Sequence, residues 1–273
     1  MKKVFIQDAS FAHCLYSNNP LPPIQFSDDI IWDRSGNYTS TDFVIYTDAL
    51  LPFSRSNASR DIAWLIEPRE LQPENYEFVE RSFERFLKIF THDASLLYLP
   101  NAVFIPYGGC WIKKEDFGLH PKSKNISIVC SSKAFLSGHK LRHQCIKRFS
   151  DQIDVFGNGY KSIDSKLEAL ADYRFQIVIE NSKVDFWFTE KLIDCFVTGT
   201  VPIYYGSPSI GKFFDQQGMI VFNDIGDLEK ILPLANKISY GSKHLSIQKN
   251  LGLAQKYLLA ENSIFKELTA YGI

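Results

Sequence analysis

Short β-rich runs alternate with amphipathic stretches along most of the chain, and this alternation restricts the fold more than any other feature. Strands are predicted at residues 2–7, 42–46, 62–66, 88–91, 103–105, 126–130, 153–156, 174–180, 201–205 and 219–222. Helices are predicted at residues 76–87, 139–149, 189–197 and 227–235. Strands that alternate with helices are typical of parallel sheets covered by helices on both faces. The chain is therefore predicted to have an α/β fold.

The length and the composition of the chain indicate two domains. A chain of 273 residues, 45% of them apolar, has the size at which one hydrophobic core commonly divides in two. The polar, lysine-rich segment 113–125, which contains Pro121, has the composition of a linker. We therefore expect a first domain at residues 1–120 and a second at 121–242. Residues 243–273 are predicted to form a long closing helix that could pack back on the first domain.

The overall charge argues against some partners. Thirty Lys and Arg residues against 31 Asp and Glu residues give a net charge of -1, which does not favour general binding to nucleic acid or to anionic membranes. No run approaches the roughly 18 apolar residues of a membrane-spanning helix, so peripheral contact is the most that we expect at a membrane. The first residues lack the apolar run of a signal peptide, and on this basis we predict a cytoplasmic protein.

Motifs for metal and dinucleotide binding do not occur in the sequence. The five cysteines are an odd number, and their spacings match no zinc motif. The Asp-x-Asp triplet through which many sugar transferases hold a divalent ion is missing. A dinucleotide fingerprint that begins at Gly157 and Gly159 would need a third glycine where Ser162 stands. We therefore predict neither a metal ion nor a dinucleotide cofactor.

The segment 173–206 contains the strongest indication of function. A predicted buried strand ends in Glu180 and Asn181, and a predicted helix after the next loop begins with Glu190 and Lys191. Ligands of α/β sheets bind outside the carboxyl ends of the strands, so these four side chains should lie in one crevice. The unpaired N–H groups and partial positive charge of the helix N-terminus, together with the ammonium of Lys191, favour a pyrophosphate group. Glu190 could bind ribose hydroxyls beside it.

The order of features in this segment is similar to the signature of a known family. A strand is followed by Glu-Asn-Ser, a short loop, Thr-Glu-Lys-Leu, a helix and Gly-Thr-Val-Pro-Ile-Tyr-Tyr-Gly. This order resembles the α1,3/4-fucosyltransferases, glycosyltransferase family 10. The resemblance implies two Rossmann-like domains facing across a cleft, an arrangement called GT-B. It also implies that the second domain binds most of the nucleotide sugar and the first domain binds the acceptor.

The resemblance assigns roles to individual residues. Glu67 stands at a predicted strand end of the first domain, where the family has its catalytic base, and Arg142 matches an arginine that contacts the donor phosphates. Trp187 stands where a tyrosine is usual, and it could either stack on the donor or pack in the interior. The donor-binding residues implied in this way are Lys140, Arg142, Glu180, Asn181, Ser182, Trp187, Thr189, Glu190 and Lys191.

The function that the resemblance implies is an inverting fucosyl transfer. L-fucose would move from the donor substrate GDP-fucose to a hydroxyl of a glycan acceptor, in α1,3 linkage to an N-acetylglucosamine or glucose type residue, and no cofactor or metal would be required. Because the loop around Trp187 departs from the family pattern, a glycosyltransferase of the same fold that uses another GDP- or UDP-sugar is an alternative. A catalytically silent nucleotide-sugar-binding module is a second alternative.

Overall fold

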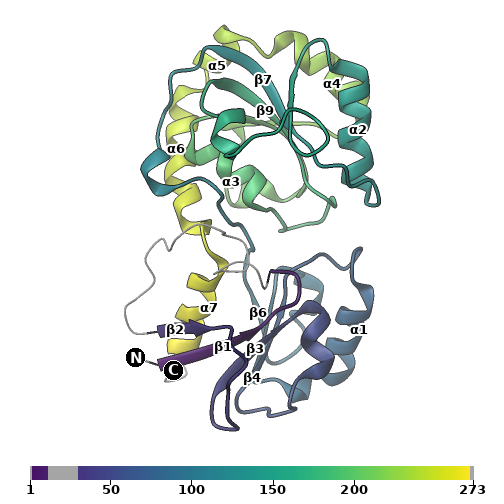
Figure 1. Ribbon diagram of the computed structural model, residues 1–273, viewed down its shortest axis with the longest axis vertical. Coiled ribbons are helices and arrows are strands. Elements are labelled where there is room, and N and C mark those ends of the chain that lie inside the picture. Colours follow the sequence, from purple (N-terminus) through teal and green to yellow (C-terminus); the bar gives the residue numbers. More distant parts are fainter. Residues whose placement is uncertain (1, 12–29, 271–273) are drawn as a thin grey trace. The chain divides into compact units, whose positions relative to one another are not determined.

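The computed structural model describes residues 2–11 and 30–270, and these form two compact units (Figure 1). The first unit contains the chain up to Tyr107 and again from Leu259 onward, and the second contains Gly108–Leu258. Each unit is built around one parallel β-sheet. The predicted α/β fold with two Rossmann-like halves is therefore confirmed.

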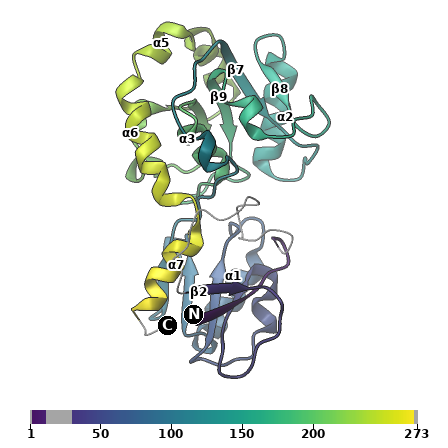
Figure 2. The same ribbon diagram turned by 60° about the vertical axis from the view of Figure 1, so that its left-hand side comes forward.

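The first unit contains a six-stranded sheet with the strand order β2-β1-β3-β4-β5-β6, and all neighbouring strands are parallel. Its strands are β1 (Lys2–Gln7), β2 (Ile30–Asp33), β3 (Phe43–Thr47), β4 (Asp61–Leu65), β5 (Lys88–Thr91) and β6 (Ala102–Phe104). The helices α1 (Pro73–Ser82) and α7 (Ala260–Thr269) lie on opposite sides of this sheet, as Figures 1 and 2 show. The 3₁₀ helix η1 (Asp48–Phe53) joins β3 to β4.

The hydrophobic core of the first unit lies between the central strands and α1. Every residue of β4 is buried, as expected for a parallel strand that is covered on both faces. Tyr76 and Val79, three residues apart on α1, both pack into this core against Val44 and Ile89 of the sheet. Pro73 occupies the first turn of α1, where the missing N–H costs no helical hydrogen bond.

The second unit contains a five-stranded parallel sheet with the strand order β11-β10-β9-β7-β8. Its strands are β7 (Lys124–Val129), β8 (Asp154–Phe156), β9 (Tyr173–Ile179), β10 (Val201–Tyr205) and β11 (Ile220–Val221). Its α-helices are α2 (Ser137–Phe149), α3 (Glu190–Val197), α4 (Ile225–Ile231), α5 (Lys237–Gly241) and α6 (His244–Ala254). The helices α2 and α4 contact each other on one side of the sheet, and α3 and α6 contact each other on the other side (Figures 1 and 2).

The strand order of the second unit determines where a ligand would bind. From β7 the chain crosses to β8 on one side, and from β9 it crosses to β10 on the other side. The carboxyl ends of the neighbouring strands β7 and β9 therefore flank the point at which the direction of winding reverses. Crevices for ligands form at such points in open α/β sheets.

Two predicted segments differ in the structure. The expected closing helix is divided, because α6 ends at Ala254 and α7 begins only at Ala260, and the two units divide between these helices. The segment 113–125, expected to be the linker, lies within the second unit. Its polar groups are bound there: Lys122 donates to the carbonyl oxygens of Leu170 and Thr198 and to the hydroxyl of Thr200.

Further 3₁₀ helices complete the connections between these elements. They are η2 (Phe83–Arg85), η3 (Ala94–Leu96), η4 (Lys114–Asp116), η5 (Lys166–Ala169), η6 (Ile210–Lys212), η7 (Gln216–Gly218), η8 (Leu232–Leu234) and η9 (Gln255–Tyr257). Among them, η5 matters most for the site, because it presents Lys166 to the residues at the start of α3.

Candidate active site

A cavity of about 300 Å³ lies at the carboxyl ends of β7 and β9, within the second unit. The predicted residues Arg142, Asn181, Glu190 and Lys191 line it, together with Lys133, His139, Lys166 and Asp194, which were not predicted to bind the donor. Four of these side chains are Lys or Arg and two are carboxylates, so positive charge predominates in the wall. Such a surface attracts an anionic ligand although the whole chain is nearly neutral.

Arg142 joins α2 to the end of β9. Its guanidinium is buried and donates to the carbonyl oxygen of Ile179 from Nε at 3.0 Å and from Nη2 at 2.8 Å. Nη2 also donates to Oδ1 of Asn181 at 2.6 Å. Burial lowers the pKa of Arg142, and the nearby Glu180 carboxylate acts in the opposite direction. The guanidinium therefore fixes both the strand end and the amide of Asn181 at the cavity wall.

Gly138 permits this close approach of α2 to β9. Its N–H donates to the carbonyl oxygen of Asn181 at 3.0 Å. A methyl group at this position would overlap the carbonyl oxygen of Glu180 and would stand 2.8 Å from that of Asn181. Only glycine therefore allows the first turn of α2 to meet the strand end, and this contact brings Arg142 to the cavity.

Glu180 organises the start of α3 from within the interior. Its carboxylate is fully buried and accepts from the backbone N–H of Thr189 at 2.9 Å and from the Thr189 hydroxyl at 2.8 Å. Lys191 donates to the same hydroxyl at 3.1 Å. Burial raises the pKa of Glu180, against the effect of the Lys191 ammonium. Glu180 thus holds the N-cap of α3 in place and does not line the cavity.

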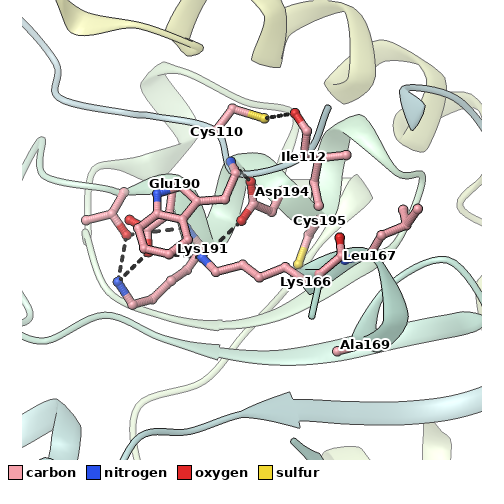
Figure 3. Close-up of polar contacts among 12 residues, drawn as sticks. Cys110, Ile112, Lys166, Leu167, Ala169, Glu190, Lys191, Asp194 and Cys195 are labelled. Carbon is pink, nitrogen blue, oxygen red and sulfur yellow. Dashed lines mark hydrogen bonds and ion pairs between the residues drawn. The ribbon is translucent and has the colours of Figure 1, made fainter. Parts of the chain in front are cut away.

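Lys166 of η5 and three charged side chains of α3, Glu190, Lys191 and Asp194, form one network (Figure 3). Lys166 binds Oε1 of Glu190 at 3.2 Å and Oδ2 of Asp194 at 3.1 Å. Lys191 binds Oε1 of Glu190 as well, at 3.1 Å. Oδ1 of Asp194 accepts from the backbone N–H of Trp111 at 2.7 Å, and the Lys166 ammonium stands 4.3 Å from the centre of the Trp111 ring.

The pKa values in this network follow from its pairing. Burial alone would raise the pKa of Glu190, but the ammonium groups of Lys191 and Lys166 outweigh burial and lower it. Burial would likewise lower the pKa of Lys166, but Glu190 and Asp194 outweigh it and raise the pKa. Glu190 is therefore a carboxylate and Lys166 an ammonium at neutral pH, within the cavity wall.

His139 lies in the cavity wall as a neutral imidazole. Its Nδ1 accepts from the backbone N–H of Leu136 at 3.3 Å, which caps the start of α2 and requires an unprotonated Nδ1. Burial lowers the pKa of His139 to about 4, and the charges of Arg142 and Lys133 act in the same direction. At neutral pH, His139 therefore adds no positive charge to the cavity wall.

Glu67, the predicted base, lies in the first unit directly after β4, where its backbone is held on both sides. Its N–H donates to Oδ2 of Asp48 at 3.3 Å, and its carbonyl oxygen accepts from the Tyr76 hydroxyl at 2.7 Å. Asp48 also accepts from the N–H of Ile66 at 2.9 Å, and it adopts a left-handed conformation with φ of 39°. Burial, opposed by the Ile66 N–H, raises the pKa of Asp48 well above its ordinary value.

Besides Glu180 and its partner Thr189, three other predicted residues do not line the cavity. Lys140 is exposed on α2, Ser182 is buried, and Trp187 is 1% exposed. In this conformation the Trp187 ring packs in the interior of the second unit and offers no face for stacking on a ligand. Of the two roles considered for Trp187, the geometry agrees with packing.

Five charged or aromatic residues of the cavity wall were not among the predicted donor-binding residues: Trp111, Lys133, His139, Lys166 and Asp194. Asp194 stands four residues after Glu190, which places both carboxylates on one side of α3, and this spacing could have revealed it. Lys166, Trp111 and His139 come from separate segments that only the folded chain brings together. The sequence contains no local signal for the first two of these, and His139 was interpreted as an ordinary helix histidine.

The described residues contain neither a metal-binding cluster nor a membrane-spanning helix. Residues 2–11 and 30–270 contain no group of three or more His, Cys, Asp or Glu side chains that could hold a metal ion. In the same part of the chain, no helix has both the length and the apolar character needed to cross a membrane.

Two parallel α/β units, one with a cationic cavity at its switch point, have the GT-B type of fold found in glycosyltransferases. A solved structure of an α1,3-fucosyltransferase with GDP superposes with a TM-score of 0.55 over 94% of this chain and 90% of that one, at 16% identity. Within this class the chain resembles glycosyltransferase family 10. Residues 119–244 match the family model described as glycosyltransferase family 10 (fucosyltransferase) C-term.

Individual relatives support the same resemblance. The α-(1,3)-fucosyltransferase FucT of Helicobacter pylori is 31% identical over 99 residues, which are 36% of this chain and 19% of the relative. The α-(1,3)-fucosyltransferase B of Drosophila melanogaster is 32% identical over 203 residues, which span 64% of this chain and 45% of the relative. The chain thus spans less than half of the length of these curated relatives.

Proposed function

We propose that this chain is an inverting fucosyltransferase that moves L-fucose from GDP-fucose to a hydroxyl of a glycan acceptor. The observation that supports it most is the cavity at the switch point of the second unit. Arg142, Asn181, Glu190 and Lys191 line this cavity, and all four lie within the 126 residues, 119–244, that match the fucosyltransferase family model. The names of related enzymes support an α1,3 linkage, and we propose an N-acetylglucosamine or glucose type residue as the acceptor.

The donor would bind through its negatively charged phosphates and through the hydroxyls of its ribose. Arg142, Lys191 and the start of α3 would face the two phosphates, which are the anionic part of the ligand. Glu190, ionised through its lysine partners, would accept hydrogen bonds from the ribose hydroxyls. As GDP departs, negative charge builds up on its β-phosphate, and the removal of one cation that stabilises such charge typically slows a reaction by roughly 10²-fold.

The acceptor would be activated by Glu67. Its carboxylate takes the proton of the acceptor hydroxyl while the bond from that oxygen to the anomeric carbon forms and the bond from this carbon to the phosphate oxygen breaks. The electron pair of the broken bond leaves with GDP, so no separate acid is needed. The backbone contacts of Glu67 with Asp48 and Tyr76 hold this residue in a defined place within the first unit.

One observation supports a second candidate. Trp187 has no hydroxyl and is buried, so a sugar contact that the family makes with tyrosine would be missing. A glycosyltransferase of the same fold with another GDP- or UDP-sugar as its donor would need no such contact. Thermal unfolding with a series of nucleotide sugars separates this candidate from the first.

The decisive binding test is the melting temperature of the whole chain with each ligand. GDP and GDP-fucose should raise it, because a ligand at about 100 times its Kd adds about 2.7 kcal/mol to the free energy of unfolding. UDP and UDP-sugars at the same concentration should leave it unchanged. A shift with another nucleotide sugar and none with GDP-fucose would contradict the fucosyl assignment. Detection of fucosylated product by mass spectrometry, in an acceptor screen, would then identify the acceptor.

A further inference from the structure

We propose that Lys166 is a positioning residue of the donor site, which holds Glu190 in the orientation that binds the ribose of a guanine nucleotide. This inference rests on the proposed function, because it assumes a nucleoside diphosphate in the cavity. Lys166 comes from η5, outside the segment 173–206 in which the sequence signals are concentrated. Its role follows from its contacts alone.

The ammonium of Lys166 is fixed on three sides. It binds Glu190 at 3.2 Å and Asp194 at 3.1 Å, and it lies 4.3 Å from the centre of the Trp111 ring. The Asp194 side chain is itself buried, with 1% of its surface exposed, and is anchored by the N–H of Trp111. Asp194 and Trp111 therefore hold the Lys166 ammonium in place before any ligand binds. Glu190 thus pairs with a cation that is already positioned.

The network also explains why a second lysine is needed beside Lys191. Glu190 and Asp194 lie one turn apart on α3, where two carboxylates repel each other. Lys166 contacts both, as Figure 3 shows, and so neutralises this repulsion. Lys191 contacts Glu190 but not Asp194, and it also donates to the hydroxyl of Thr189. Without Lys166, Asp194 would be a buried carboxylate that lacks a cationic partner.

The two lysines bind the same oxygen of Glu190. Both ammonium groups contact Oε1, whereas Oε2 accepts no hydrogen bond from the described residues. Glu190 lines the cavity, so Oε2 is the oxygen available to ribose hydroxyls. Lys166, together with Lys191, therefore occupies one carboxylate oxygen of Glu190 and leaves the other for the ligand.

The test compares GDP with 2′,3′-dideoxy-GDP, which has the same phosphates and base but no ribose hydroxyls on the ring. Calorimetry with the whole chain should show that the wild type prefers GDP by roughly 10-fold or more, as expected for hydrogen bonds to a charged group. In Lys166→Met this preference should fall toward one, while dideoxy-GDP binds nearly as in the wild type. Lys166→Arg, which can still bridge two carboxylates, should keep most of the preference.

Two further variants test whether the effect comes only from the loss of a positive charge or from the unpaired charge left on Asp194. Lys230→Met removes an exposed lysine of the same unit from α4 and should leave both affinities unchanged. The double variant Lys166→Met/Asp194→Asn removes the charge that Lys166→Met leaves buried. It should fold where the single variant does not, and it should show the same loss of preference.

The outcomes are distinguishable. A wild type that binds no GDP would contradict the proposed function itself, and a wild type that binds GDP and dideoxy-GDP equally would remove the ribose role of Glu190 and the inference with it. The wild type and the variants without Lys166 could prefer GDP over dideoxy-GDP by the same factor. In that case Lys166 does not position Glu190, and the proposed function still stands. An equal loss of affinity for both ligands would show a general charge effect and would also overturn the inference.

Discussion

His139 shows how the fold can suppress the charge of a single residue. Its imidazole caps α2 through an unprotonated Nδ1, and burial together with neighbouring cations lowers its pKa to about 4. The unfolded chain takes up this proton near pH 6.5. The contribution of His139 to the free energy of unfolding is therefore complete above pH 6.5, decreases as the pH falls below 6.5, and is fully lost below about pH 4.

The substitution His139→Asn tests this linkage, because asparagine keeps an acceptor near the position of Nδ1 and does not titrate. Between pH 7 and pH 5 the wild type should lose roughly 1 to 2 kcal/mol more of its free energy of unfolding than the variant. Urea unfolding at the two pH values measures the difference. An identical pH dependence in both proteins would show that His139 titrates normally in the folded state.

The proposed role of Glu67 as the base can be tested separately from donor binding. In Glu67→Gln the amide cannot accept the acceptor proton, so transfer should fall about 10²- to 10⁴-fold. The affinity for GDP should stay the same, because the cavity belongs to the second unit and Glu67 to the first. Product formation and GDP calorimetry measure the two effects.

The matched control for this experiment is Glu70→Gln, which removes an exposed carboxylate three residues further along the chain. It should affect neither transfer nor binding. Transfer at the wild-type rate in Glu67→Gln would exclude Glu67 as the base.

Single residues were predictable only where a local pattern marked them. Asn181, Glu190 and Lys191 stand at a strand end and a helix start, and the structure brings them to one cavity. Glu180 stands at the same strand end, yet its side chain turns inward to Thr189. Adjacent residues at the end of a strand point to opposite sides, and the sequence does not show which side faces the ligand. Lys166 reaches the site only through tertiary folding.

At the scale of elements, the contact of α2 with β9 depends on Gly138. In Gly138→Ala the new methyl group would overlap the carbonyl oxygen of Glu180, so α2 must shift, and Arg142 shifts with it. We expect a loss of about 1 to 3 kcal/mol in the free energy of unfolding and a weaker affinity for GDP. Chemical unfolding and calorimetry measure both.

Gly252→Ala is the control for this substitution. Gly252 lies inside α6, and a methyl group there meets no atom within 4 Å. The variant should be as stable as the wild type or more stable by up to about 1 kcal/mol, because alanine favours helices. Equal effects of the two substitutions would show that α2 does not need its close approach to β9.

Most elements could be predicted because apolar periodicity marks buried strands and amphipathic helices. The structure has β1, β5 and β10 at the predicted residues. The four-residue edge strand β2 was missed, although β5, of the same length, was found, because so short a run gives only a weak periodic signal. The closing helix was predicted as continuous because its apolar spacing continues through η9. The break before α7 follows instead from the division of the chain between two units, which no local pattern records.

For the whole molecule, GDP binding should change the rate of backbone hydrogen exchange in the second unit and not in the first. Hydrogen exchange should slow at backbone N–H groups of β9 and α3 when GDP is added, because these elements supply the cavity wall. Exchange in β3 and β4 of the first unit should stay as it was. Peptide-resolved exchange measured by mass spectrometry tests this. Protection of β3 and β4 without protection of α3 would place the nucleotide in the first unit.

The helix α7 has a consequence for the order in which the protein is completed during translation. Its buried side chains Ile264 and Leu268 belong to the first unit, yet the ribosome makes them after every residue of the second. The six strands of the first sheet are therefore synthesised early, and one side of the sheet lacks its helix until α7 has been synthesised. Domains generally fold as they are synthesised, but here the first unit can be completed only after the whole second unit has been made.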